Sequence, residues 1–100
     1  MDTVQQIAPN EYETTVVVTN ELGLHARPAA LVAKTAQQFS AEITLCADSR
    51  QVNAKSILDI LSLAAGQGTS LIVRGKGEDA EECLKILAGL IRVQFQEELA

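Results

Sequence analysis

Residues 14–30 read TTVVVTNELGLHARPAA, a stretch that changes from strand to turn to helix within one short span. The β-branched run at its start predicts a strand over residues 11–19. Asparagine and glycine among residues 20–23 predict a turn. Apolar side chains then recur every three or four positions, which predicts a helix over residues 26–39. The fold therefore begins with a strand, a turn and a helix.

The rest of the chain continues this alternation of elements. The predicted strands cover residues 42–47, 51–54 and 69–74, and the predicted helices cover residues 56–65 and 79 to about 98. Ser56 and Asp59 have the spacing of a capping box at the start of the shorter helix. The order β-α-β-β-α-β-α predicts an α+β domain of two layers, one open sheet with helices on a single face.

Composition narrows the class of protein. The chain has 100 residues, of which 47% are hydrophobic, which is enough for one domain. We expect this domain at residues 11–100, after a loose, polar N-terminal extension at residues 1–10. A net charge of −5 and three aromatic residues disfavour nucleic-acid binding. No apolar run reaches the roughly 18 residues of a membrane helix, and the N-terminus does not resemble a signal peptide. We therefore expect a cytoplasmic protein.

Metal and disulfide chemistry are also disfavoured. Cys46 and Cys83 lie far apart in the sequence in apolar surroundings, so we expect two free thiols. With a single histidine, the usual His/Cys spacing of a zinc site is missing. We expect neither a metal nor another cofactor.

His25 is the only histidine, and its neighbours give it a distinctive setting. Pro28 is tolerated only in the first turn of a helix, so the helix begins near His25. Helix N-termini favour anions, and Arg27 adds a planar fork of donors that suits phosphate oxygens. An imidazole can accept a phosphoryl group, yet no second histidine, adjacent carboxylate or metal set is present to complete a hydrolysis. The pattern is compatible with a phosphoryl carrier, but taken alone it fits a surface helix cap beside a solvated arginine somewhat better.

Two longer motifs resemble one known family. Residues 23–29 read GLHARPA, and residues 52–58 read VNAKSIL, followed by LSL at 61–63 and GQGT at 66–69. Over about residues 12–98 the chain resembles HPr, the histidine-containing phosphocarrier of the bacterial phosphotransferase system. The resemblance implies an open-faced β-sandwich in which a four-stranded antiparallel sheet, in the order 1-4-2-3, carries three helices on one face.

The same resemblance implies a function and its partners. Enzyme I, charged by phosphoenolpyruvate, would phosphorylate His25 on Nδ1, and a IIA domain of a sugar permease would then take the phosphoryl group. Arg27 would stabilise that group, and the protein would be a monomer and not a stand-alone enzyme. The surface that docks both partners would contain Leu24, Ala30, Lys34, Ile57, Leu58 and Leu61.

Ser56 corresponds to the regulatory serine of the family. Its simplest role is a helix N-cap. The resemblance adds phosphorylation by HPr kinase/phosphorylase, which would place negative charge in the docking surface and affect a transcriptional regulator. A mainly regulatory phosphocarrier in carbon or nitrogen signalling, without sugar transport, is therefore an alternative. Asp59 and the net charge of −5 weaken the expected steering toward an acidic enzyme I, leaving Arg27, Lys34 and Lys55 to provide it.

Overall fold

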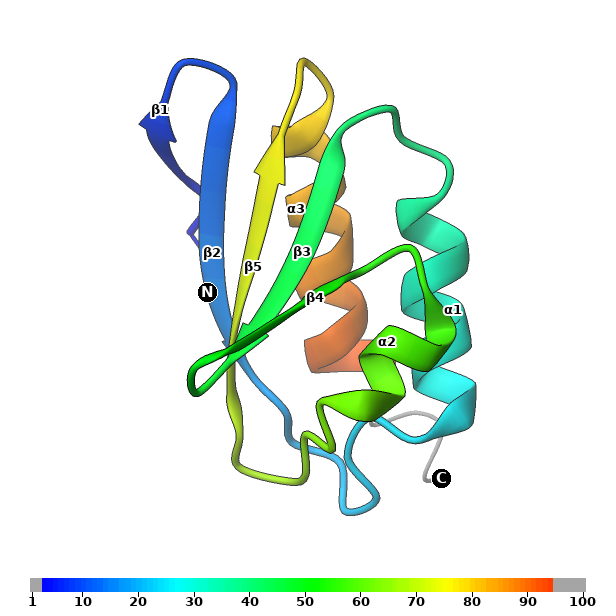
Figure 1. Ribbon diagram of the computed structural model, residues 1–100. Coiled ribbons are helices and arrows are strands. Elements are labelled where there is room, and N and C mark those ends of the chain that lie inside the picture. The colour runs from blue at the N-terminus through cyan, green and yellow to red at the C-terminus, as the bar shows by residue number, and fades with distance from the viewer. Residues whose placement is uncertain (1–2, 95–100) are drawn as a thin grey trace.

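An antiparallel sheet with helices packed on one face forms the domain in the computed structural model, which describes residues 3–94 (Figure 1). The sheet has five strands in the order β1-β2-β5-β3-β4. The strands are β1 (Gln5–Ala8), β2 (Glu11–Val17), β3 (Glu42–Ala47), β4 (Arg50–Asn53) and β5 (Ser70–Lys76). The helices are α1 (Ala26–Ala36), α2 (Ile57–Ser62) and α3 (Ala80–Gly89), and a π-helical turn (Leu90–Gln94) continues α3. The predicted α+β class with three helices on one face is confirmed.

The prediction of a four-stranded sheet is wrong, because the sheet has a fifth strand. The four predicted strands do lie side by side, as β2-β5-β3-β4, and β1 adds to the outer edge of β2. β1 pairs antiparallel with β2, with Gln5 opposite Glu13 and a bulge between Gln6 and Ala8. The expectation of a loose extension is therefore wrong for residues 5–8.

The boundaries of the helices differ from the predictions by a few residues. α1 ends at Ala36 and not at residue 39, because the amides of Gln38 and Phe39 bond to carbonyls only three residues back. α2 ends at Ser62, shortly before Ala64, whose positive φ of 51° does not continue a helix. The last helix changes to the π-helical turn after Gly89, and residues 95–98 of that prediction lie outside the described residues.

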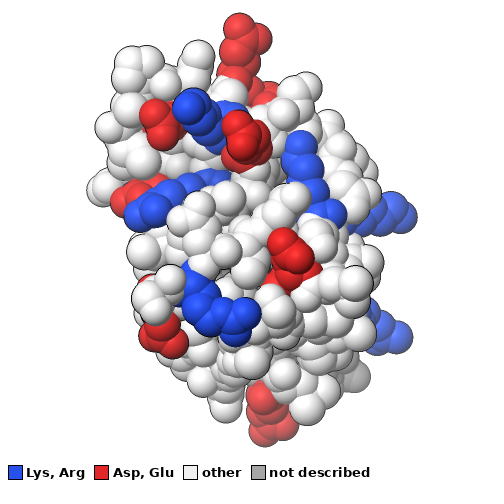
Figure 2. All heavy atoms as spheres, in the orientation of Figure 1, with Lys and Arg blue, Asp and Glu red and all other residues white. Residues whose placement is uncertain are grey.

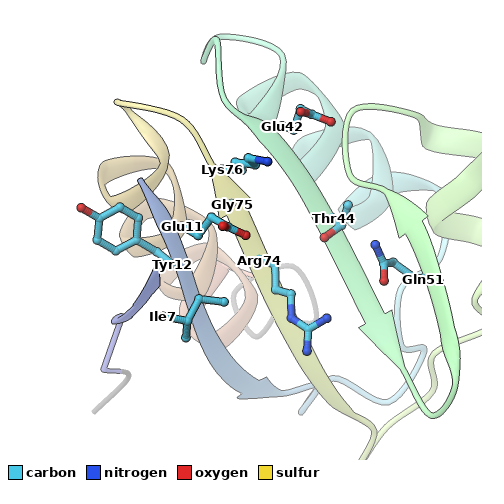
Figure 3. A pocket seen from close by; sticks show the side chains of 9 residues that line it. All are labelled: Ile7, Glu11, Tyr12, Glu42, Thr44, Gln51, Arg74, Gly75 and Lys76. Carbon is cyan, nitrogen blue, oxygen red and sulfur yellow. The ribbon is translucent and has the colours of Figure 1, made fainter. Parts of the chain in front are cut away.

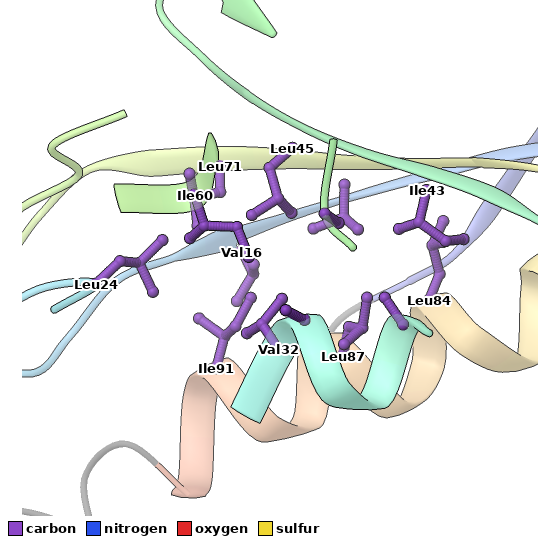
Figure 4. Close-up of a cluster of buried hydrophobic side chains, with 14 of the residues drawn as sticks. Val16, Leu24, Val32, Ile43, Leu45, Ile60, Leu71, Leu84, Leu87 and Ile91 are labelled. Carbon is purple, nitrogen blue, oxygen red and sulfur yellow. The ribbon is translucent and has the colours of Figure 1, made fainter. Parts of the chain in front are cut away.

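One apolar core holds the helices against the sheet (Figure 4). Val16 of β2, Val18 just after it, and Leu71 and Val73 of β5 face inward and are fully or almost fully buried, whereas Val17 is 45% exposed. The helices contribute fully buried side chains that are drawn in the same cluster: Val32, Ile60, Leu84, Leu87 and Ile91. This packing fixes α1 on the sheet and so sets the position of its N-terminus.

Candidate functional site

His25 is the N-cap residue of α1. Its backbone is extended, with φ −81° and ψ −172°, and the helix begins at Ala26. The first helical hydrogen bond runs from the amide of Ala29 to the carbonyl of His25, at 3.0 Å. Pro28 lies in the first turn of α1, as predicted, and its side chain is buried. The first turn contains no acidic residue, so the positive end of the helix dipole lies beside His25 without an opposing carboxylate on α1.

The imidazole of His25 does not act as a helix cap, because the side chain makes no capping hydrogen bond to α1. His25 as a whole is half-buried, and its Nε2 atom is buried. Arg27 is exposed two residues further on, in the first turn of α1. The simple explanation of His25 as a side-chain cap of α1 therefore loses its support.

Two loops meet beneath His25 and determine where it lies. The amide of Leu24 donates to the carbonyl of Ala65 at 2.9 Å, and the amide of Gly68 donates to the carbonyl of Val18 at 2.8 Å. Gly23 has a φ of +67°, and a Cβ atom there would lie 2.4 Å from the carbonyl oxygen of Ala65. Only glycine fits this close approach. The β2–α1 loop is thus pressed onto the loop that follows α2.

Ser56 is the N-cap residue of α2, as the sequence predicted. Its Oγ accepts a hydrogen bond from the amide of Asp59 at 3.2 Å. The second half of a capping box is missing, because the Asp59 carboxylate accepts from the amide of Asn53 at 3.4 Å. The neighbouring Lys55 donates through Nζ to the carbonyl of Phe39 at 2.7 Å. Lys55 therefore joins the segment before α2 to the turn after α1. This hydrogen bond engages a positive charge that was expected to steer a partner.

The predicted docking residues separate into exposed and buried groups. Leu58 is 78% exposed and Ile57 is 41% exposed, both on α2. Lys34 is exposed on α1, whereas Ala30 and Leu61 are half-buried. Leu24 is only 5% exposed and belongs to the core, so its prediction as a docking residue is corrected: its side chain packs inward from the loop.

Leu22 is an exposed residue that the sequence analysis missed. It is 67% exposed and lies three residues before His25. An isolated leucine among turn residues, between Glu21 and Gly23, was the available signal. Leu22, Ile57 and Leu58 give this end of the molecule apolar side chains that water does not favour.

Other features of the surface are less specific. Acidic and basic side chains are interspersed on the face seen in Figure 2, as expected for a soluble surface without a strong field of one sign. A pocket on the open face of the sheet is lined by residues of both charges, among them Glu11, Glu42, Arg74 and Lys76, and lies away from α1 and α2 (Figure 3).

Within residues 3–94, the structure shows no metal cluster, disulfide or membrane-spanning helix. No group of three His, Cys, Asp or Glu side chains there could hold a metal ion. Cys46 and Cys83 are free and buried, as expected, and burial raises the pKa of the Cys83 thiol to about 11. Every helix in this part of the chain is too short or too polar to cross a lipid bilayer.

The chain is similar to known proteins over most of its length. It matches the family described as PTS HPr component, phosphorylation site, over residues 12–92. The phosphocarrier protein HPr of Xylella fastidiosa is 43% identical over 86 residues, which cover 86% of this chain and 97% of that protein. The phosphocarrier protein NPr of Shewanella violacea is 39% identical, over 85% of this chain and 93% of that protein.

A solved structure of an HPr protein is also similar to this chain. The crystal structure of HPr-C-His from Thermoanaerobacter tengcongensis superposes with a TM-score of 0.80 at 45% identity, covering 84% of this chain and 94% of that chain. The family consists of phosphocarriers and not of stand-alone enzymes, as the motifs implied. This chain belongs to the HPr family of phosphocarrier proteins of the phosphotransferase system.

Proposed function

We propose that His25 accepts a phosphoryl group from phospho-enzyme I and passes it to IIA domains of sugar permeases in the cytoplasm. The observation that carries this proposal is the position of His25 at the N-terminus of α1, whose first turn contains no acidic residue. A helix N-terminus stabilises a bound anion such as a phosphoryl group.

The chemistry follows from the ring atoms. Because Nε2 is buried, the attacking atom we propose is Nδ1. A lone pair on Nδ1 forms the new nitrogen–phosphorus bond while the bond from phosphorus to the donor breaks and the donor keeps its electron pair. The guanidinium of Arg27 and the dipole of α1 stabilise the charge on the phosphoryl oxygens. The reverse sequence of bond changes transfers the group to the next protein.

Labelling tests this proposal directly. The protein is incubated with enzyme I and phosphoenolpyruvate, and the phosphate is mapped by mass spectrometry. We expect one acid-labile, base-stable phosphate on His25 and none on a His25→Ala variant. A Ser56→Ala variant is the matched control and should accept the label like the wild type. Equal labelling of His25→Ala would reject the proposal.

We propose a second, regulatory modification at Ser56. Its hydroxyl lies at the N-terminus of α2 next to the exposed Ile57 and Leu58. A phosphate there would add about two negative charges within the docking surface without breaking the helix. Incubation with HPr kinase/phosphorylase and ATP should phosphorylate Ser56 and slow the transfer from enzyme I to His25. Wild-type transfer rates in the modified protein would contradict a regulatory role.

We consider two roles for the phosphoryl-transfer pathway, which are sugar transport and regulation. Relatives named HPr and NPr are both similar to this chain, and a mainly regulatory carrier in carbon or nitrogen signalling is the alternative to sugar transport. A panel of purified IIA domains distinguishes them: rapid transfer to a IIA domain of a sugar permease supports transport. Transfer confined to a IIA domain without a permease, or binding to a transcriptional regulator, supports the alternative.

A further inference from the structure

Asn20 is a buried polar side chain in the loop that precedes α1. It is 0% exposed, although its neighbours Thr19 and Glu21 are exposed. Its Nδ2 donates a hydrogen bond to the carbonyl oxygen of Gly23 at 2.8 Å. Its Oδ1 atom is buried and accepts no hydrogen bond from the described residues. Burying the Asn20 carboxamide while its Oδ1 accepts no hydrogen bond lowers the stability of the fold. The hydrogen bond that its Nδ2 donates should therefore have a role.

The carbonyl of Gly23 connects Asn20 to His25. Besides the Asn20 side chain, this oxygen accepts a hydrogen bond from the backbone amide of His25 at 3.0 Å. The amide of Gly23 in turn donates to the carbonyl of Asn20 at 3.1 Å. The orientation of one peptide group is therefore set by Asn20 and sets the direction in which the chain enters α1.

A second contact, with Ala65, holds the segment of Gly23 and Leu24. Gly23 presses against the carbonyl of Ala65, and the next amide, that of Leu24, bonds to the same oxygen. The segment lies between the loop after α2 on one side and the Asn20 amide on the other. Removal of either contact frees His25 to shift relative to the start of α1.

We propose that Asn20 is a positioning residue for His25: through the Gly23 carbonyl it holds the imidazole where the phosphoryl group is received. This rests on the proposed function of His25. Because Asn20 is fully buried, it cannot touch a partner protein, so its effect falls on the transfer step and not on docking. A misplacement of a reacting group by about 1 Å can slow a reaction roughly a hundredfold.

The test compares three proteins in transfer from phospho-enzyme I. Asn20→Ala removes the side-chain hydrogen bond. Gln67→Ala is the matched control, since Gln67 Nε2 also donates to a carbonyl of the same loop, that of Thr19 at 3.0 Å, but does not reach Gly23. We expect Asn20→Ala to lower kcat roughly tenfold to a hundredfold with little change in KM, and Gln67→Ala to match the wild type. An unchanged kcat, or a change in KM alone, would overturn the proposal.

Nitrogen NMR shifts of the His25 imidazole provide a readout that a purely structural role would not move. We expect them to change in folded Asn20→Ala and to stay as in the wild type in Gln67→Ala. The signal is recorded without any phosphoryl group, so it tests Asn20 even if His25 proves not to accept phosphate. Unchanged imidazole shifts in the folded variant would overturn the proposal.

A measurement on the wild-type chain covers the case in which Asn20→Ala does not fold. The side-chain NH₂ of Asn20 should show a scalar coupling to the Gly23 carbonyl carbon and should exchange with solvent more slowly than that of Gln67. Exchange as fast as that of the exposed Gln67 would show that the hydrogen bond is absent, which overturns the proposal.

Discussion

At the scale of single residues, the site depends on groups with different tasks. His25 supplies the ring, Arg27 supplies charge at the same helix end, and Gly23 permits the close approach of two loops. Each of these tasks can be removed by substituting one residue while the other two residues stay in place. The chain can therefore be tested by substitutions that separate chemistry from folding.

Arg27 should affect transfer and not stability, because it is exposed. We expect Arg27→Ala to slow phosphoryl transfer to His25 roughly tenfold to a hundredfold, the value of a charge-assisted hydrogen bond. Arg27→Lys should recover only part of the rate, since a lysine cannot present two parallel donors. Rapid-quench kinetics with phospho-enzyme I measure this, and wild-type rates for Arg27→Ala would contradict the role of Arg27.

Substitutions of three glycines distinguish the cost of a positive φ from the cost of a steric clash. Gly23 has a positive φ and a backbone oxygen where its Cβ would lie, Gly68 has a positive φ of 89° and open space, and Gly66 has open space without a positive φ. We expect Gly23→Ala to destabilise the fold by about 2 kcal/mol or more, Gly68→Ala by about 1 kcal/mol, and Gly66→Ala to be neutral or slightly stabilising. Urea unfolding measures the series, and equal losses for Gly23→Ala and Gly68→Ala would contradict the close approach to Ala65.

At the scale of elements, helix ends do most of the positioning. The beginning of α1 was predictable from Pro28, because proline is restricted to the first turn. Its end was not, since Gln37, Gln38 and Phe39 have ordinary helix propensities and only the tertiary contacts stop the helix. The strand β1 was missed because its single large apolar residue, Ile7, is 49% exposed and its stabilisation comes from backbone pairing with β2.

The candidate site was predictable to a similar extent. The helix start at His25 and the N-cap at Ser56 follow from local sequence rules, and both were found. The burial of Leu24, the exposure of Leu22 and the bond from Lys55 to Phe39 depend on how distant segments pack. No local pattern contains that information.

Asp79 links two elements and gives the protein a pH-dependent stability. Its carboxylate accepts hydrogen bonds from the amides of Ser40 at 2.8 Å and Ala41 at 2.9 Å, which hold the loop before β3 at the start of α3. These bonds, that from Ser40 foremost, keep the pKa of Asp79 below its ordinary value. A lowered folded-state pKa means that the stabilisation is fully present above about pH 5, beyond the unfolded pKa near 3.9. It is lost as the pH falls through the folded-state pKa.

We therefore expect the free energy of unfolding of the wild type to decrease below about pH 5 more steeply than that of Asp79→Asn. Urea unfolding at a series of pH values measures both slopes. The variant keeps one acceptor oxygen and the size of the side chain, so it should remain folded at pH 7. Identical slopes below pH 5 would contradict the role of Asp79.

At the scale of the whole molecule, β1 covers the part of the sheet edge that Glu11, Tyr12 and Glu13 of β2 form. Without it, β2 would present unpaired backbone groups, a common template for pairing with another chain. The exposed Val17 on β2 and Ile7 on β1 lie on this side of the sheet. We propose that β1 disfavours pairing of this edge with a second copy of the chain.

Deletion of residues 1–8 tests this inference. The shortened chain should fold and should accept phosphate on His25, since β1 is the outermost strand and pairs only with β2. It should also form dimers at lower concentrations than the full chain does, as measured by sedimentation equilibrium. A shortened chain that stays monomeric over the same concentrations would contradict the role of β1.

The central claim is that His25 carries a phosphoryl group between proteins, and reversal of the first transfer tests it most directly. The protein is charged with enzyme I and phosphoenolpyruvate, purified, and mixed with uncharged enzyme I in the absence of any other phosphoryl acceptor. We predict that His25 loses the mass of one phosphoryl group as enzyme I gains it, with little inorganic phosphate released. A phosphoryl group that stays on the chain, or that appears as inorganic phosphate, would contradict the carrier function.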